Sequence, residues 1–171
     1  MRIVKGKFAG HDLTSPADKR VRPTAEHVRA AMLDMLGTDV KDSSVLDLFA
    51  GTGALGLEAI SRGATRADFV EFRPASLHAL RANIAALRLR DCTRVFKKDA
   101  LPFAASLKSE SYDIAFADPP YESRMLDRVI DSWRAGKFSR ILAVEHARTH
   151  VLPKGTQKKT LDDSSITIYR L

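Results

Sequence analysis

Short apolar runs alternate with longer amphipathic segments through most of the chain. The runs lie between turn residues, which is typical of buried strands. We predict strands over residues 45–49, 67–71, 93–97, 112–117 and 140–145. The segments between them repeat apolar residues at three- and four-residue spacing, as amphipathic helices do. They predict helices over residues 53–62 and 102–107, and another around Leu126 to Trp133. A further helix is predicted to begin at Pro74, with apolar residues from Leu77 to Leu87 on one face.

Strands that alternate with helices favour a parallel sheet covered on both faces, because each crossover between parallel strands is right-handed. The predicted fold class is therefore α/β, with a single doubly wound, Rossmann-like sheet. Two further β segments, 157–161 and 166–170, are joined by the turn-forming residues 162–165. They predict an antiparallel C-terminal end to a mostly parallel sheet.

A helix is predicted ahead of the first buried strand. Apolar residues recur at helical spacing over 28–36, and Gly37 follows them. Thr24 is the predicted N-cap, because a threonine hydroxyl can accept a hydrogen bond from a free backbone N–H in the first turn.

The beginning of the chain has the pattern of a β-hairpin. Residues 2–14 can pair with each other around Gly6 or Gly10. We therefore expect an N-terminal extension over residues 1–24 that contacts substrate, and a main domain over residues 25–171.

The composition suits a folded domain with a sizeable core. The chain has 171 residues, 44% of them hydrophobic, and a chain of this length buries about 70% of its unfolded surface. A disordered chain and a mini-protein held by metal or disulfides are thereby excluded. The apolar stretch over residues 48–57 is shorter than the about 18 residues of a membrane helix.

The cellular compartment of the protein can also be predicted from the start of the sequence and its cysteine content. The first residues are charged and no apolar run follows them, so no secretory leader is expected. With a single cysteine, Cys92, no intrachain disulfide can form, which fits a reducing compartment. We expect a cytoplasmic protein with no membrane partner.

The net charge of +7 is concentrated at the two ends of the chain. Residues 25–145 carry 17 basic and 17 acidic side chains, whereas residues 1–24 carry 6 and 2, and residues 146–171 carry 5 and 2. Basic ends favour approach to a polyanion such as RNA, and a solvated surface is the alternative. The same two interpretations apply to a basic cluster near the third strand: Arg88, Arg90, Arg94, Lys97 and Lys98.

A glycine loop follows the first predicted strand. Residues 51–56 match G-x-G-x-x-G between a strand and a helix, where glycines let the backbone pass close to a ligand. Glu71 ends the next strand, at the position where an acidic side chain accepts hydrogen bonds from ribose hydroxyls. A surface pair between Glu71 and Arg73 is the alternative. The pattern indicates an adenosine-containing cofactor and leaves a dinucleotide and S-adenosylmethionine both open.

The fourth strand ends in Asp118-Pro119-Pro120-Tyr121. Proline donates no backbone hydrogen bond and fixes φ, so this turn presents rigid carbonyl acceptors. The Asp118 carboxylate and the Pro119 carbonyl could accept the two hydrogens of a nucleobase amine, while Tyr121 stacks on the ring. A pyridine-nucleotide dehydrogenase has no need for paired acceptors, so the turn favours methyl transfer to an amine.

Three segments resemble the bacterial 16S rRNA guanine-N2 methyltransferase family (RsmD-like): Arg22-Pro23-Thr24, residues 46–64 around the glycine loop, and Asp118-Pro119-Pro120-Tyr121. The resemblance implies a class I methyltransferase that uses S-adenosylmethionine and releases S-adenosylhomocysteine. It also implies 16S rRNA as partner, naked or within an assembling or assembled small ribosomal subunit. A monomer is expected.

The resemblance also implies roles for individual residues. The cofactor would contact Asp47, Phe49, Ala50, Gly51, Thr52, Gly53, Glu71, Asp99 and Ala100. The catalytic turn would be Asp118, Pro119, Pro120 and Tyr121, and substrate would also meet Arg22, Pro23 and Thr24. The chain departs from the family near its end, where Asp162-Asp163-Ser164 replaces a frequent Tyr-Gly.

Other functions stay open at this point. The chain could be another nucleic-acid amino-methyltransferase, for example one acting on adenine N6, a non-catalytic RNA-binding module, or a dehydrogenase. A metal site is not expected. His146 and His150 are four residues apart but follow a strand, and methyl transfer to an amine requires no metal.

Overall fold

The computed structural model describes residues 1–16, 25–120 and 124–171. The strands are Ser44–Asp47 (β1), Arg66–Val70 (β2), Thr93–Phe96 (β3), Tyr112–Ala117 (β4), Ser139–Ala147 (β5), Gln157–Leu161 (β6) and Ser164–Arg170 (β7). The α-helices are Glu26–Leu36 (α1), Ala54–Ser61 (α2), Pro74–Ala86 (α3), Ala100–Ala105 (α4) and Met125–Gly136 (α5). Two short 3₁₀ helices cover Gly37–Val40 and Arg90–Cys92.

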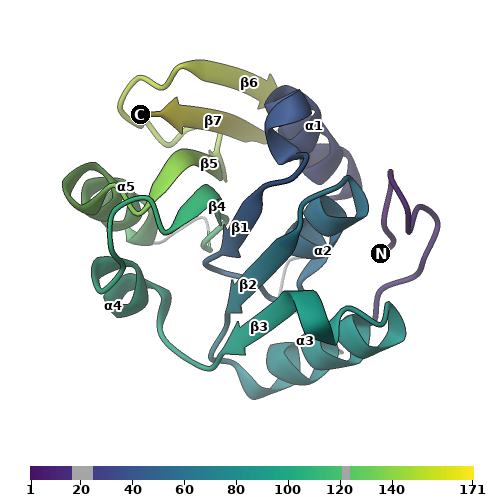
Figure 1. Ribbon diagram of the computed structural model, residues 1–171. Helices are drawn as coiled ribbons and strands as arrows, with labels where there is room; N and C mark the ends of the chain where they lie inside the picture. The colour runs from purple at the N-terminus through teal and green to yellow at the C-terminus, as the bar shows by residue number, and fades with distance from the viewer. Residues whose placement is uncertain (17–24, 121–123) are drawn as a thin grey trace.

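One sheet holds all of these strands, in the order β3-β2-β1-β4-β5-β7-β6 (Figure 1). The pairs from β3 across to β5 are parallel, and β7 pairs antiparallel with both β5 and β6. The predicted fold class is therefore confirmed. The direction of strand succession reverses between β1 and β4, and doubly wound sheets bind their ligands at such a reversal.

The two faces of the sheet pack against different helices. Successive side chains of a strand point to opposite faces, so Val45 joins the core under α1, α2 and α3, whereas Leu46 joins the core under α4 and α5. Figure 1 shows these two helix layers on either side of the sheet. None of the helices in the described part of the chain has the length and apolar character needed to cross a bilayer.

Most element boundaries lie within two residues of the predicted ones, and two differences have a clear cause. Helix α4 begins at Ala100, not at residue 102, because the Asp99 side chain caps it and accepts a hydrogen bond from the Leu101 N–H at 3.0 Å. Strand β5 extends beyond residues 140–145 because β7 pairs along it up to Ala147, which lies opposite Ser164.

The N-cap prediction for Thr24 was wrong. The N-cap position of α1 is Ala25, whose carbonyl accepts hydrogen bonds from the N–H groups of Val28 and Arg29 at 3.0 Å. Alanine has no side-chain acceptor, so the residue at this position caps the helix only through its backbone. Thr24 itself lies outside the described residues.

The predicted β-hairpin over residues 2–14 is present in a short form, with one antiparallel bridge between Arg2 and Asp12 and backbone hydrogen bonds that join Ile3 to Gly10 and His11. Between these two arms, the middle of the segment bonds to helix α2. The Val4 N–H donates to the Glu58 carboxylate at 3.2 Å, and the Phe8 N–H donates to Ser61 Oγ at 2.9 Å. The predicted division of the chain at residue 24 stays a prediction.

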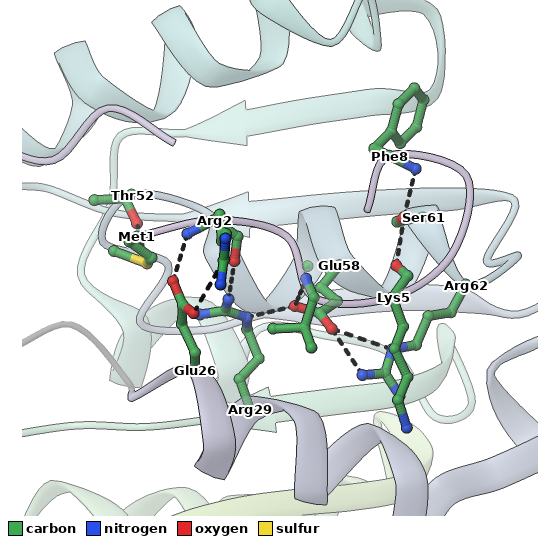
Figure 2. A network of polar contacts seen from close by, with 12 residues as sticks. Met1, Arg2, Lys5, Phe8, Glu26, Arg29, Thr52, Glu58, Ser61 and Arg62 are labelled. Atoms are coloured by element: carbon green, nitrogen blue, oxygen red, sulfur yellow. Dashed lines mark hydrogen bonds and ion pairs between the residues drawn. The ribbon is translucent and has the colours of Figure 1, made fainter. Parts of the chain in front are cut away.

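A buried ion pair lies where the N-terminal segment, α1 and α2 meet. The Arg29 Nε donates to the Glu58 carboxylate at 2.7 Å, and both side chains are fully buried. Arg29 also donates to the Arg2 carbonyl, and Arg62 reaches the second oxygen of Glu58 at 2.7 Å (Figure 2). Lys5 and Arg62 share Asp34 at the surface end of this network.

We expect E58Q to lower the free energy of unfolding by about 3–5 kcal/mol, because the change removes the buried negative charge that pairs with Arg29 and Arg62. Chemical denaturation of the two proteins measures this difference. The control is D39A, which breaks the half-exposed pair with Arg170 and should cost less than about 1 kcal/mol. A loss below 1 kcal/mol in E58Q would contradict the structural role of the pair.

Candidate functional site

A cavity of about 530 Å³ opens at the carboxyl ends of the strands, at the reversal between β1 and β4. Its lining combines the glycine loop, the end of β2, the start of α4 and the turn after β4. The predicted site residues that line it are Asp47, Phe49, Ala50, Gly51, Thr52, Glu71, Asp99, Ala100, Asp118, Pro119 and Pro120. The fold thus brings together residues that lie far apart in the sequence.

The glycine loop takes backbone conformations that favour glycine. Gly51 and Gly53 have φ values of +54° and +82°. Gly53 does not line the cavity, and a Cβ there would lie 2.4 Å from the Leu80 side chain. A Cβ on Gly56 would lie 2.5 Å from the Phe69 ring. These two glycines therefore let helix α2 pack closely, while Gly51 faces the cavity.

Glu71 holds the loop and the start of α3 together. The residue is 9% exposed. One oxygen accepts a hydrogen bond from the Gly51 N–H at 2.9 Å, and the other accepts from the N–H groups of Phe72 and Arg73 at 2.8 Å. Each carboxylate oxygen has two acceptor positions, so the oxygen facing Gly51 can take one more donor. A ribose hydroxyl fits that position.

Asp47 is a carboxyl group buried at the end of β1, with 3% of its surface exposed. Burial raises its pKa to about 7, and the charge of Glu71 adds to this, against a hydrogen bond from the Gly56 N–H at 3.2 Å. A cation in the cavity would favour the ionised carboxylate. The residues on this side therefore fit an adenosine group at Glu71 and an ammonium group near Asp47.

The turn after β4 faces the same cavity. The Leu48 N–H donates to the Phe116 carbonyl at 3.1 Å, which ties the start of the glycine loop to the last residues of β4. Asp118 is half-buried and Pro119 is buried. Tyr121 and the predicted substrate contacts Arg22, Pro23 and Thr24 lie outside the described residues.

Several lining residues were missed by sequence reasoning: Met1, Phe72, Ser76, Met125 and Glu145. Phe72 is 55% exposed and directly follows Glu71, and an exposed aromatic beside an acidic residue could have been noticed. Glu145 lies near the end of β5, and attention to polar residues near strand ends would have found it. Met1 and Met125 carry no local signal.

The two candidate histidines take part in other contacts. His146 bonds to Thr167 Oγ1 at 2.9 Å and to the Ala147 carbonyl at 3.0 Å, and His150 lies 3.1 Å from Asp127. Within the described ranges, no group of three or more His, Cys, Asp or Glu side chains could hold a metal ion.

The strand order, the glycine loop, the acidic residue after β2 and the Asp-Pro-Pro turn together define a class I methyltransferase, whose methyl donor is S-adenosylmethionine. The chain belongs to the family described as conserved hypothetical protein 95, whose model matches residues 1–167.

Relatives and a solved structure agree with this assignment. YlbH of Bacillus subtilis, named as a candidate rRNA methyltransferase, is 30% identical over 99% of this chain and 98% of its own. The ribosomal RNA small subunit methyltransferase D of Escherichia coli K12 is 37% identical over 77% of this chain and 65% of its own. A solved E. coli structure described as a candidate methyltransferase, yhhF, is 30% identical with a TM-score of 0.85, covering 99% of this chain and 97% of that one.

The raised pKa of Asp47 predicts how stability depends on pH. Between pH 3.8 and about 7 the folded protein keeps a proton on Asp47 that the unfolded chain releases. The contribution of Asp47 to the free energy of unfolding therefore falls as pH rises through that window, by roughly 1.4 kcal/mol per pH unit at most. We expect D47N to lose this dependence, so that its stability relative to the wild type rises with pH. Denaturation curves of both proteins from pH 4 to pH 8 measure the difference, and parallel curves would contradict it.

Proposed function

We propose that the protein transfers a methyl group from S-adenosylmethionine to the exocyclic N2 amine of a guanine in small-subunit rRNA. One observation carries the proposal. The Asp-Pro-Pro turn after β4 and the glycine loop after β1 open on the same cavity, from two strands that pair directly. Acceptors for an amine therefore lie next to the predicted cofactor site.

Residues of β1 and β2 would hold the cofactor. When bound, S-adenosylmethionine supplies a methyl group on a positively charged sulfur. Glu71 would accept a hydrogen bond from a ribose hydroxyl, and Asp47 would lie near the ammonium group of the methionine part. Asp99 and Ala100 line the cavity at the start of α4, where we expect the adenine.

Residues of the turn after β4 would prepare the nucleophile. The lone pair of a nucleobase amine is delocalised into the ring, so the nitrogen is a poor nucleophile while it stays planar. If the Asp118 carboxylate and the Pro119 carbonyl accept its two hydrogens, the nitrogen can become pyramidal and direct its lone pair at the methyl carbon. The N–C bond forms as the S–C bond breaks, S-adenosylhomocysteine is the second product, and the methylated nitrogen releases a proton.

No strong base is needed for this step, because the amine becomes acidic once it is methylated. The main contribution is the fixed orientation of amine and methyl group, for which effective concentrations of about 10⁵ M or more are known. Preorganised acceptors at the nitrogen add to it. The target base has to be unpaired or rotated out of its stack to reach the turn.

The choice of guanine and of small-subunit rRNA rests on the family. Adenine N6 and cytosine N4 present the same NH₂ group, so the chemistry of the turn selects only the class of amine. The E. coli relative, 37% identical, is named for the small-subunit RNA, and the resemblance of the motifs is to guanine-N2 enzymes.

Part of the excess positive charge is available for an RNA surface. Lys7 is exposed beside the Phe8 ring, and Lys158 and Lys159 are exposed on the edge strand β6. Other basic side chains at the N-terminus have acidic partners, since Lys5 lies 2.8 Å from Asp34. We propose that rRNA crosses the cavity mouth, where the N-terminal segment begins at Met1.

We expect D118A to lower the rate of methyl transfer roughly a hundredfold, the scale of losing one preorganised polar contact. Affinity for S-adenosylhomocysteine, measured by calorimetry, should stay within about twofold, because the cofactor is assigned to other residues. The control is D131A, which removes an exposed carboxylate on α5 and should keep full activity. Turnover near the wild-type value in D118A would contradict the mechanism.

The substrate itself is tested with cofactor labelled in its methyl group. The protein is incubated separately with naked 16S rRNA, small ribosomal subunits, DNA and protein, and the labelled RNA is digested to nucleosides. We expect label in N2-methylguanosine from the small-subunit RNA or particle. Label in N6-methyladenosine would contradict the guanine assignment, and transfer to none of the four would contradict the proposed function.

A further inference from the structure

The side-chain amide of Asn83, on α3, joins two distant parts of the chain. Its Oδ1 accepts a hydrogen bond from the Thr14 N–H at 2.7 Å, and its Nδ2 donates to the Thr14 carbonyl at 3.0 Å. Nδ2 also donates to the carbonyl of Thr52 at 2.9 Å. The side chain is 2% exposed. Both of its donor hydrogens are therefore used, one on the N-terminal segment and one on the glycine loop.

Both ends of the N-terminal segment, which we define as residues 1–14, are connected to Thr52. The end at Thr14 is connected to it through the side chain of Asn83. At the other end, Met1 Sδ lies 4.0 Å from Thr52 Oγ1, as Figure 2 shows. The Leu13 N–H donates to the Met1 carbonyl at 2.7 Å, so the two ends also hold each other. Met1 and Thr52 both line the cavity.

The middle of the N-terminal segment is fixed to the helix that follows the glycine loop. The Lys7 N–H donates to the Ser61 carbonyl at 2.7 Å, at the C-terminal end of α2. Gly6 lies so close to this point that a Cβ would be 1.9 Å from the Ser61 oxygen. The middle of the segment, residues 4–8, is therefore bonded to α2, and its end at Thr14 is connected through Asn83 to the loop before α2.

Local preferences do not explain an asparagine at position 83. Asparagine is a weaker helix former than alanine or leucine, and this position lies inside a helix. Leu80 and Ile84, on the same buried face, are apolar. The amide serves contacts outside its own helix: it bonds to the backbone of Thr14 and to the buried carbonyl of Thr52, and so fixes the position of the glycine loop relative to α3.

We propose that Asn83 is a positioning residue for methyl transfer, which fixes the glycine loop and couples the cofactor site to the N-terminal segment. Cofactor that binds against the loop then also stabilises the position of the segment, and by thermodynamic reciprocity RNA that binds the segment increases cofactor affinity. The coupling to RNA rests on the proposed function, whereas the effect on cofactor affinity does not.

The first test follows Asn83 itself, without any substitution. It is the only asparagine of the chain, so protein labelled with ¹⁵N in asparagine side chains gives one amide pair in a heteronuclear NMR spectrum. We expect both amide proton signals to shift when S-adenosylhomocysteine is added, because one proton bonds to the loop. Signals that do not move at saturating ligand would overturn the proposal.

The second test uses N83L, which keeps the approximate volume and removes all three hydrogen bonds. We expect its dissociation constant for S-adenosylhomocysteine, measured by calorimetry, to rise about tenfold. The matched control is Y112F, which removes a buried hydrogen bond to Asp68 at 2.7 Å, outside the cavity lining. The control should lose stability and keep its ligand affinity within twofold. An N83L affinity within twofold of the wild type would overturn the proposal.

The third test measures the coupling. Affinity for a 16S rRNA fragment is determined with and without saturating S-adenosylhomocysteine. We expect the ligand to tighten RNA binding about fivefold or more in the wild type and less than twofold in N83L. If the ligand tightened RNA binding by the same factor in the wild type and in N83L, the proposed coupling through Asn83 would be overturned. The failure of every 16S rRNA fragment to bind would instead contradict the proposed function, since the first two tests contain no RNA.

Discussion

The pairing of β1 with β4 is the constraint on which the candidate site depends. These strands run parallel with Asp47 opposite Phe116, and the chain leaves them for helices on opposite faces of the sheet. No crossover therefore covers the edge between their carboxyl ends. The hydrogen bond from the Leu48 N–H to the Phe116 carbonyl continues the pairing one residue beyond β1. A loop that can hold a cofactor and a turn that can hold an amine are thus kept at a fixed separation by backbone bonds.

Local patterns predicted the parts of the structure that local forces decide. Strand β4 begins and ends where the sequence indicated, because a mostly apolar run, broken only by Asp113, is bounded there by a serine and an aspartate. The glycine loop and Glu71 fall at the cavity for a similar reason, since conformational freedom at glycine and a carboxylate at a strand end are properties of the residues themselves.

The parts that sequence reasoning missed depend on distant partners. The sequence pattern of the N-terminal segment predicts a hairpin, but it does not show that Glu58 and Ser61 bind the middle of that hairpin to helix α2. Asn83 has no recognisable motif around it, and its importance is visible only when Thr14 and Thr52 are placed beside it. Such contacts have large sequence separations, so no window of the sequence contains both partners.

The edge strands of the sheet carry basic side chains that oppose pairing with a further strand. Strand β6 at one edge carries the exposed pair Lys158 and Lys159, and Arg94 on strand β3 at the other edge is paired with Asp68. A second copy of β6 that added to the β6 edge would bring these lysines close to their counterparts, and their charges would have to lose water. Cations that can attract RNA phosphates thereby also keep the backbone groups of the edge strands from nucleating aggregates during synthesis and folding.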